Sequence, residues 1–156
     1  TAGEVHDRLM IIGADLVVET TRKIFEGRVS TQKQADILKG QKPKLAYKIF
    51  KESCKIDWSQ ESTKVHNHIR GLSPYPTAFS TLKFPDGKEV AFKIFKGEKN
   101  NEILEVGEIK TDGKTELYIG CGEGSILICE LQIAGKKRMQ VKSFLQGVKL
   151  DDVTIV

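Results

Sequence analysis

The chain has 156 residues, of which 39% are hydrophobic and 29% are charged, a composition typical of a globular protein that can bury one hydrophobic core. No apolar run approaches the roughly 18 residues that a membrane span needs, so we expect no membrane partner. The three cysteines are an odd number without C-x-x-C spacing, which argues against a disulfide framework or a zinc site and favours reduced thiols in a cytoplasmic protein.

The positive charge is concentrated in two stretches, although the net charge of the whole chain is only +4. Residues 33–51 contain six lysines and one aspartate, and residues 136–149 contain five basic residues and no acidic residue. Each stretch therefore carries +5, which leaves −6 on the rest of the chain. Two basic clusters on an acidic body are typical of a polyanion-binding face, because each cation near a phosphate releases a counterion. Solvated surface stretches would show the same pattern.

Residues 1–27 are predicted to form a helix. Thr1 and Glu4 have the spacing of a capping box, and Gly27 is a suitable end. Gly13 could divide the segment into two helices. An apolar stripe at helical spacing comprises Val5, Leu9, Ile12 and Leu16. Because this stripe needs a partner and the chain begins with Thr, we expect a further segment upstream.

Residues 28–55 are predicted to form a basic linker. Lysine and glutamine are frequent, Gly40 and Pro43 interrupt the segment, and no periodicity is sustained. We expect extended chain with one helical turn around residues 34–39.

The segment from Ile56 to Phe79 is predicted to deliver a short helix into a β-domain. Ser59 is the expected helix cap, and Val65, Ile69 and Leu72 form one apolar stripe. Two prolines then favour an extended chain between Pro74 and Pro76. We expect Trp58, Tyr75 and Phe79 to pack in the core, although such rings could instead stack on nucleic-acid bases.

From Thr77 onward the hydrophobic period changes to two, and glycine-containing turns separate the apolar runs. Residues 97–101 are expected to be a polar loop, and residues 140–146 a short helix with Phe144 and Leu145 inward. The expected strands are residues 77–84, 88–95, 107–111, 115–121 and 125–133. We predict a mainly β fold: a small five-stranded Greek-key barrel of the oligonucleotide-binding type, with N-terminal helices and a linker.

Several motifs, in the same order along the chain, resemble the C-terminal part of the methionyl-tRNA formyltransferase family. They are A-x-K-I-x-K-E at 46–52, IDWS at 56–59, IRGL at 69–72, the P-x-P-x-A step ending at Ala78, and Gly135-Lys136-Lys137. The resemblance covers nearly the whole chain and independently implies the barrel fold. It implies that residues 1–27 are a helical remnant of the catalytic domain, 28–55 the interdomain linker and 56–156 the C-terminal barrel domain.

The resemblance also implies a function. The intact enzymes of this family transfer a formyl group from 10-formyltetrahydrofolate to methionyl-initiator tRNA in translation initiation. Their catalytic Asn, Asp and H-x-S-L-L-P motif lie in an N-terminal catalytic domain, and this chain contains none of these motifs. We therefore expect no catalytic residue and no cofactor in this chain, no activity by the chain alone, tRNA as its partner, and a monomer.

The candidate tRNA-binding residues are cations in the linker, in the helix and in the C-terminal basic run. Contacts of such residues with a sugar-phosphate backbone give affinity and orientation, and little sequence information. Arg70 could instead bond to carbonyl groups of the Pro74–Pro76 segment. Two histidines, His66 and His68, point about 200° apart on a helix and cannot share a metal ion. The candidates are Lys42, Lys44, Lys48, Arg70, Lys136, Lys137, Arg138 and Lys149.

Two alternatives remain at the level of sequence. The chain could be a free-standing nucleic-acid-binding module of the oligonucleotide-binding type, although an uncovered stripe on the first helix would argue against that. It could also belong to a formyltransferase that acts on an amino sugar nucleotide, in which case the basic clusters would have no long polyanion to meet.

Overall fold

The computed structural model describes residues 1–156, and the chain divides into two compact units. The barrel unit comprises Thr1–Gly3 and Phe50–Val156, and the helical segment comprises Glu4–Ile49. No helix combines the length and the apolar character needed to cross a membrane.

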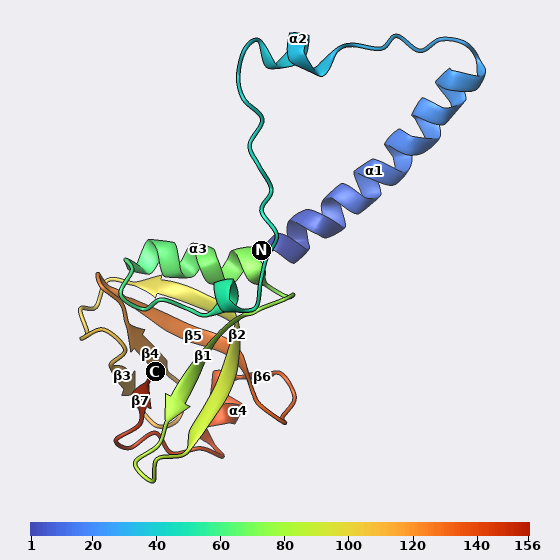
Figure 1. Ribbon diagram of the computed structural model, residues 1–156. Helices are drawn as coiled ribbons and strands as arrows, with labels where there is room; N and C mark the ends of the chain where they lie inside the picture. The colour runs from blue at the N-terminus through green and yellow to red at the C-terminus, as the bar shows by residue number, and fades with distance from the viewer. The chain divides into compact units, whose positions relative to one another are not determined.

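Helix α1 (Ala2–Phe25) is the predicted N-terminal helix, and it is continuous through Gly13, so the possible division there does not occur (Figure 1). Gly13 lies inside the helix, where an added Cβ atom would have no neighbouring atom within 4 Å, and one glycine costs only about 1 kcal/mol in a helix of this length. Gly27 follows the end of the helix at φ +66°. None of the residues of α1 is buried. Helix α2 (Gln34–Leu38) is the expected turn in the linker.

The barrel unit contains seven antiparallel strands in the order β3-β4-β5-β2-β1-β7, with β6 paired to β5 (Figure 1). The mainly β barrel fold is therefore confirmed, with two strands more than expected. The two additional strands have two residues each, too few to show a hydrophobic period. The strands are β1 (Ala78–Lys83), β2 (Glu89–Asn100), β3 (Ile109–Thr111), β4 (Leu117–Gly120), β5 (Ser125–Ile133), β6 (Met139–Gln140) and β7 (Thr154–Ile155).

The two outer strands of the sheet, β3 and β7, are not hydrogen-bonded to each other, yet the sheet is nearly closed. A Cβ atom on Gly107, which precedes β3, would lie 3.5 Å from the Cβ of Ile155 in β7. Gly107 adopts φ +76°, a conformation that favours glycine. The close approach at Gly107 therefore brings the two edges of the barrel together.

Strand β2 continues through the segment that was expected to be a polar loop, so that expectation is wrong. Gly97 pairs with Ile128 and Lys99 with Ile126 of β5, after register shifts around Lys96. A Cβ on Gly97 would meet Ile126 Cγ2 at 2.8 Å. Glycine is thus required here by close packing between strands, and not by a turn.

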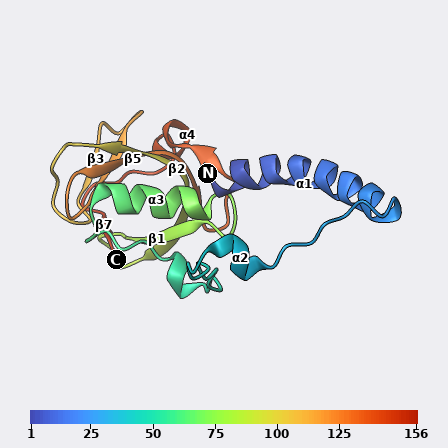
Figure 2. The ribbon, with the colours of Figure 1, turned by 90° about the horizontal axis from the view of Figure 1, so that it is seen from above.

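Helix α3 (Ser62–Leu72) lies across the barrel and buries the predicted stripe of Val65, Ile69 and Leu72 (Figure 2). Its N-cap is Glu61, so the expected capping role of Ser59 is wrong. The Ser59 hydroxyl instead donates to Asp57 Oδ1 at 2.6 Å. A short 3-10 helix η1 (Glu52–Cys54) precedes this segment.

The core is formed by inward side chains of the strands and by helices α3 and α4 (Val141–Leu145). Phe144 and Leu145 are buried as expected, and Trp58 is 5% exposed with its Nε1 donating to Ser80 Oγ at 3.0 Å. Tyr75 is 86% exposed, so its predicted core position is wrong. It lies in the loop between α3 and β1, where the bonds Ser73–Pro74 and Tyr75–Pro76 are cis.

Candidate nucleic-acid interface

The outer side of helix α3 is cationic and carries no acidic residue. Because Val65, Ile69 and Leu72 face the barrel, the remaining positions of this 11-residue helix point away from the core. Its basic residues are Lys64, His66, His68 and Arg70, and no carboxylate occurs in residues 62–83. The helix therefore presents positive charge along its exposed side.

One flank of α3 brings three basic groups together. The pKa of His66 is lowered by partial burial, then by the nearby charges of Arg70 and of Lys99 in β2, and the carboxylate of Glu98 opposes this shift. Arg70 Nε donates to Asn67 Oδ1 at 2.8 Å. The guanidinium is thus held along the helix by Asn67, and not by carbonyl groups of the Pro74–Pro76 segment.

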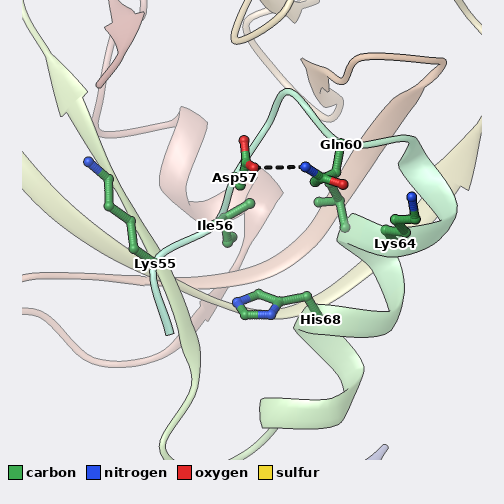
Figure 3. A pocket seen from close by; sticks show the side chains of 7 residues that line it. Lys55, Ile56, Asp57, Gln60, Lys64 and His68 are labelled. Atoms are coloured by element: carbon green, nitrogen blue, oxygen red, sulfur yellow. Dashed lines mark hydrogen bonds between the residues drawn. The ribbon is translucent and has the colours of Figure 1, made fainter. Parts of the chain in front are cut away.

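The opposite flank of α3 borders a hollow of about 170 Å³ (Figure 3). The buried residues Ile56 and Val65 close its floor. The exposed Lys55 and Lys64 stand on its two sides, with the half-buried ring of His68 between α3 and the strand-like segment at Lys55. Neither lysine makes an ion pair with a carboxylate.

The acidic group of this hollow, Asp57, is occupied by local donors. Its carboxylate accepts hydrogen bonds from the backbone N–H of Ser59 (3.0 Å), the hydroxyl of Ser59 (2.6 Å) and Nε2 of Gln60 (2.9 Å). These bonds, led by the Ser59 hydroxyl, lower the pKa of Asp57. In Figure 3 the carboxylate faces Gln60, which leaves the two lysines without a direct acidic partner.

The turn between β5 and β6 holds the C-terminal basic run. Gly135 has φ +77°, and Lys136 and Lys137 are exposed. Arg138 instead makes a bidentate ion pair with Glu130, with Nε–Oε1 at 2.6 Å and Nη2–Oε2 at 2.5 Å. Its guanidinium carbon also lies 4.3 Å from the centroid of the Phe95 ring. Arg138 therefore ties β6 to β5 and β2, and two lysines remain as exposed cations.

The other candidates lie elsewhere. Lys42, Lys44 and Lys48 are exposed in the helical segment, and Lys149 is exposed after α4. Within the barrel unit, α3 and α4 pack at different ends of the barrel in the view of Figure 1. The barrel candidates Arg70, Lys136 and Lys149 belong to three separate places, which are α3, the β5–β6 turn and the segment after α4.

Acidic residues are concentrated in a different part of the barrel unit. Residues 102–116, around β3 and the loop that precedes it, contain five acidic residues and two lysines, a net charge of −3. Lys110 of β3 is paired with Glu102. This region would repel a polyanion, so charge alone favours contact through α3 and the β5–β6 turn.

No group of histidine, cysteine and carboxylate side chains is arranged to hold a metal ion. The cysteines are free, Cys54 and Cys121 are buried, and burial raises the pKa of the Cys121 thiol to about 11. The buried thiols are thus small core residues and not reactive groups.

Lys55, Lys64 and Lys99 are positive groups that charge counting along the sequence did not select. They lie outside the two basic stretches, and each has an acidic residue within three positions in the sequence. The signal that could have indicated α3 is the run from 62 to 83 without any carboxylate.

Comparison with known proteins places the chain in the same family by two independent routes, a family match and the similarity to individual relatives. Residues 48–149 match the family described as formyl transferase, C-terminal domain. The methionyl-tRNA formyltransferase of Bacteroides thetaiotaomicron is 43% identical over 150 residues, which cover 95% of this chain and 47% of that protein. The methionyl-tRNA formyltransferase of Azobacteroides pseudotrichonymphae is 46% identical over 150 residues, 94% of this chain and 46% of that protein. This chain spans about half the length of these curated relatives.

Among solved structures, a variant of HypX from Aquifex aeolicus aligns with a TM-score of 0.60 and 19% sequence identity. The alignment covers 88% of this chain and 24% of that one. At this identity the likeness concerns the fold alone.

Proposed function

Since this chain belongs to the family of formyl transferase C-terminal domains, we propose that it is the tRNA-binding, C-terminal part of a methionyl-tRNA formyltransferase. The intact protein would transfer a formyl group from 10-formyltetrahydrofolate to methionyl-initiator tRNA. The barrel unit and the linker lysines would hold the tRNA by its backbone, and the reaction would take place in another part of the protein.

The observation that carries the tRNA-binding proposal is the separation of charge in the barrel unit. Helix α3 and the β5–β6 turn carry exposed cations, whereas the region around β3 is acidic. A sugar-phosphate backbone would be attracted to the first surfaces and repelled by the second. The exposed cations are spread over α3, the β5–β6 turn and the linker, and an amino sugar nucleotide has too few phosphates to contact all of them. We therefore rank an amino sugar nucleotide below tRNA as the substrate.

We propose that the formyl donor binds in another part of the intact protein. A folate site needs an enclosed pocket with several converging polar groups. A second hollow of the barrel unit, of about 430 Å³ between Lys55–Ser59 and β7, has Asp57 as its acidic group, and that carboxylate is already hydrogen-bonded to Ser59 and Gln60. The one buried polar side-chain atom without a partner, Ser125 Oγ, lies outside this hollow. We therefore propose no activity for the chain alone.

The test is direct binding of the chain to initiator tRNA, elongator tRNA and a DNA duplex across a salt series. We expect weak binding to both tRNAs, little discrimination between them, and a steep loss of affinity with salt. The variant Lys136→Ala/Lys137→Ala should bind more weakly with a shallower salt slope. Arg138 is left unchanged, because its loss would disturb the ion pair with Glu130. Binding that is unaffected by salt would contradict the proposal.

A further inference from the structure

We propose that Lys55, Lys64 and His68 bind one phosphate group of the tRNA backbone in the hollow beside α3. This inference rests on the proposed tRNA-binding function and adds a defined subsite to it. The hollow, its lining and its charges are shown in Figure 3.

Two separate elements place cationic donors on opposite sides of the hollow. Lys55 comes from the segment that pairs with Phe79 of β1, and Lys64 from the first turn of α3. A phosphate group has oxygen atoms on all sides and can accept from both ammonium groups at once. The buried floor formed by Ile56 and Val65 prevents the ligand from entering the core.

The charge balance of the hollow favours an anion. Two lysines and the Asp57 carboxylate give a net charge of +1 when His68 is neutral. The carboxylate is stabilised by Ser59 and Gln60 and faces that turn, so it does not neutralise the lysines directly. Because neither lysine is held in an ion pair, a phosphate need not displace a carboxylate to reach the ammonium groups.

The ring of His68 can supply a third donor. Its Nε2 lies 3.5 Å from the carbonyl oxygen of Cys54, at the limit of hydrogen-bonding distance. The ring is half-buried against the hollow, so a small rotation would direct an N–H donor toward a bound oxygen.

A nucleic-acid phosphate fits better than a small free anion because the positive surface continues beyond the hollow. On the other flank of the same helix, Arg70 and Lys99 lie near His66, and the carboxylate of Glu98 offsets only one of these two cations. Neighbouring phosphates of one strand could therefore meet α3 on both sides. A free phosphate would use the hollow alone.

The test compares two variants that lose the same charge. In Lys55→Gln/Lys64→Gln the hollow is neutralised, and in Lys88→Gln/Lys114→Gln two exposed turn lysines are neutralised. The tRNA dissociation constant is measured against salt concentration for both variants and for the unchanged chain. We expect the hollow variant to lower the magnitude of the salt slope by about 1, with roughly tenfold weaker binding near 0.1 M salt. The control variant should change neither value appreciably.

A third variant, Lys55→Arg/Lys64→Arg, should retain binding because it keeps both charges, and the thermal unfolding of every variant verifies folding. In a parallel experiment, inorganic phosphate replaces chloride at constant ionic strength while the NMR signals of the His68 ring are followed. A shift of these signals in the unchanged chain, lost in the Gln variant, supports the subsite.

The outcomes separate the two proposals. Equal losses in the hollow and control variants would overturn the subsite while tRNA binding stands. Absence of tRNA binding by the unchanged chain would overturn the proposed function and the tRNA phosphate together. If His68 then still responded to inorganic phosphate, the ligand would be a small phosphate compound and the tRNA assignment would be wrong.

Discussion

Replacement of Gly122 by alanine tests the contact that holds the Asp57–Gln60 loop on the barrel. The Cβ of an alanine would lie 2.0 Å from the carbonyl oxygen of Ser59 and 2.9 Å from its carbonyl carbon. The N–H of Gly122 donates to the carbonyl oxygens of Trp58 and Gln60, both at 2.9 Å. The two loops would have to separate, because the clashing atoms belong to backbone on both sides.

The expected destabilisation has two physical sources. Breaking the shared hydrogen bond costs about 1 kcal/mol, and forced displacement of packed backbone costs a further ~1–3 kcal/mol. The free energy of unfolding should fall by about 2–4 kcal/mol, and the midpoint of thermal unfolding by roughly 10 °C or more. Gly71→Ala is the matched control, because no atom lies within 4 Å of its Cβ position and alanine favours a helix by about 1 kcal/mol.

Urea unfolding followed by circular dichroism measures both variants. If Gly122→Ala were within ~0.5 kcal/mol of the unchanged chain, the described approach of the two loops would be wrong. If Gly71→Ala were as destabilised as Gly122→Ala, the destabilisation could not be attributed to the steric conflict at Gly122.

Three further predictions concern stability and reactivity. Ile69→Ala, at a 1% exposed position on the buried face of α3, should lower the free energy of unfolding by about 2–5 kcal/mol in urea titrations, and an effect below ~1 kcal/mol would contradict the packing. Hydrogen bonds led by the Glu116 N–H lower the pKa of Asp112, so its stabilising effect exists above pH ~4 and is lost as pH falls further. Asp112→Asn should be less stable than the unchanged chain at pH 7, and this difference should shrink below pH ~4. The buried Cys121 thiol should escape alkylation at pH ~8 until unfolding, and peptide mass mapping would reveal early labelling.

The barrel could be predicted from local patterns wherever a strand and its turn lie within one short segment. Strand β5 runs from Ser125 to Ile133 in the structure, as its apolar run indicates. The turn after Phe84 has a hydrogen bond from the Gly87 N–H to the Phe84 carbonyl oxygen, and φ is +82° at Gly87. Alternation and turn chemistry are sufficient in these places because the determinants are adjacent in sequence.

The missed features depend on interactions between distant segments. Gly97 and the residues after it have loop-like composition, but pairing with β5 makes them part of β2. The two-residue strands β6 and β7 exist only because β5 and β1 provide their partners. The place of Tyr75 between two prolines predicts a ring packed on the barrel, yet Tyr75 is 86% exposed in the loop between α3 and β1.

In the candidate site too, the features that distant segments form together could not be predicted from the sequence. Charge counting along the chain identifies Lys136 and Lys137, which are exposed, but it cannot show that Glu130 neutralises Arg138 across two strands. Charge counting along the chain also cannot predict the hollow beside α3. Lys55 and Lys64 become neighbours of one cavity only through the bridge between Lys55 and Phe79 and the packing of α3.

The central claim is that the barrel unit binds tRNA through its cationic surfaces and not through its acidic region. The most direct measurement is NMR chemical-shift mapping of the ¹⁵N-labelled chain during titration with initiator tRNA. We predict that shifts concentrate on α3, on Lys55 and on the β5–β6 turn, and that residues 102–116 stay unchanged. Shifts centred on residues 102–116, or no shifts at low salt, would contradict the account.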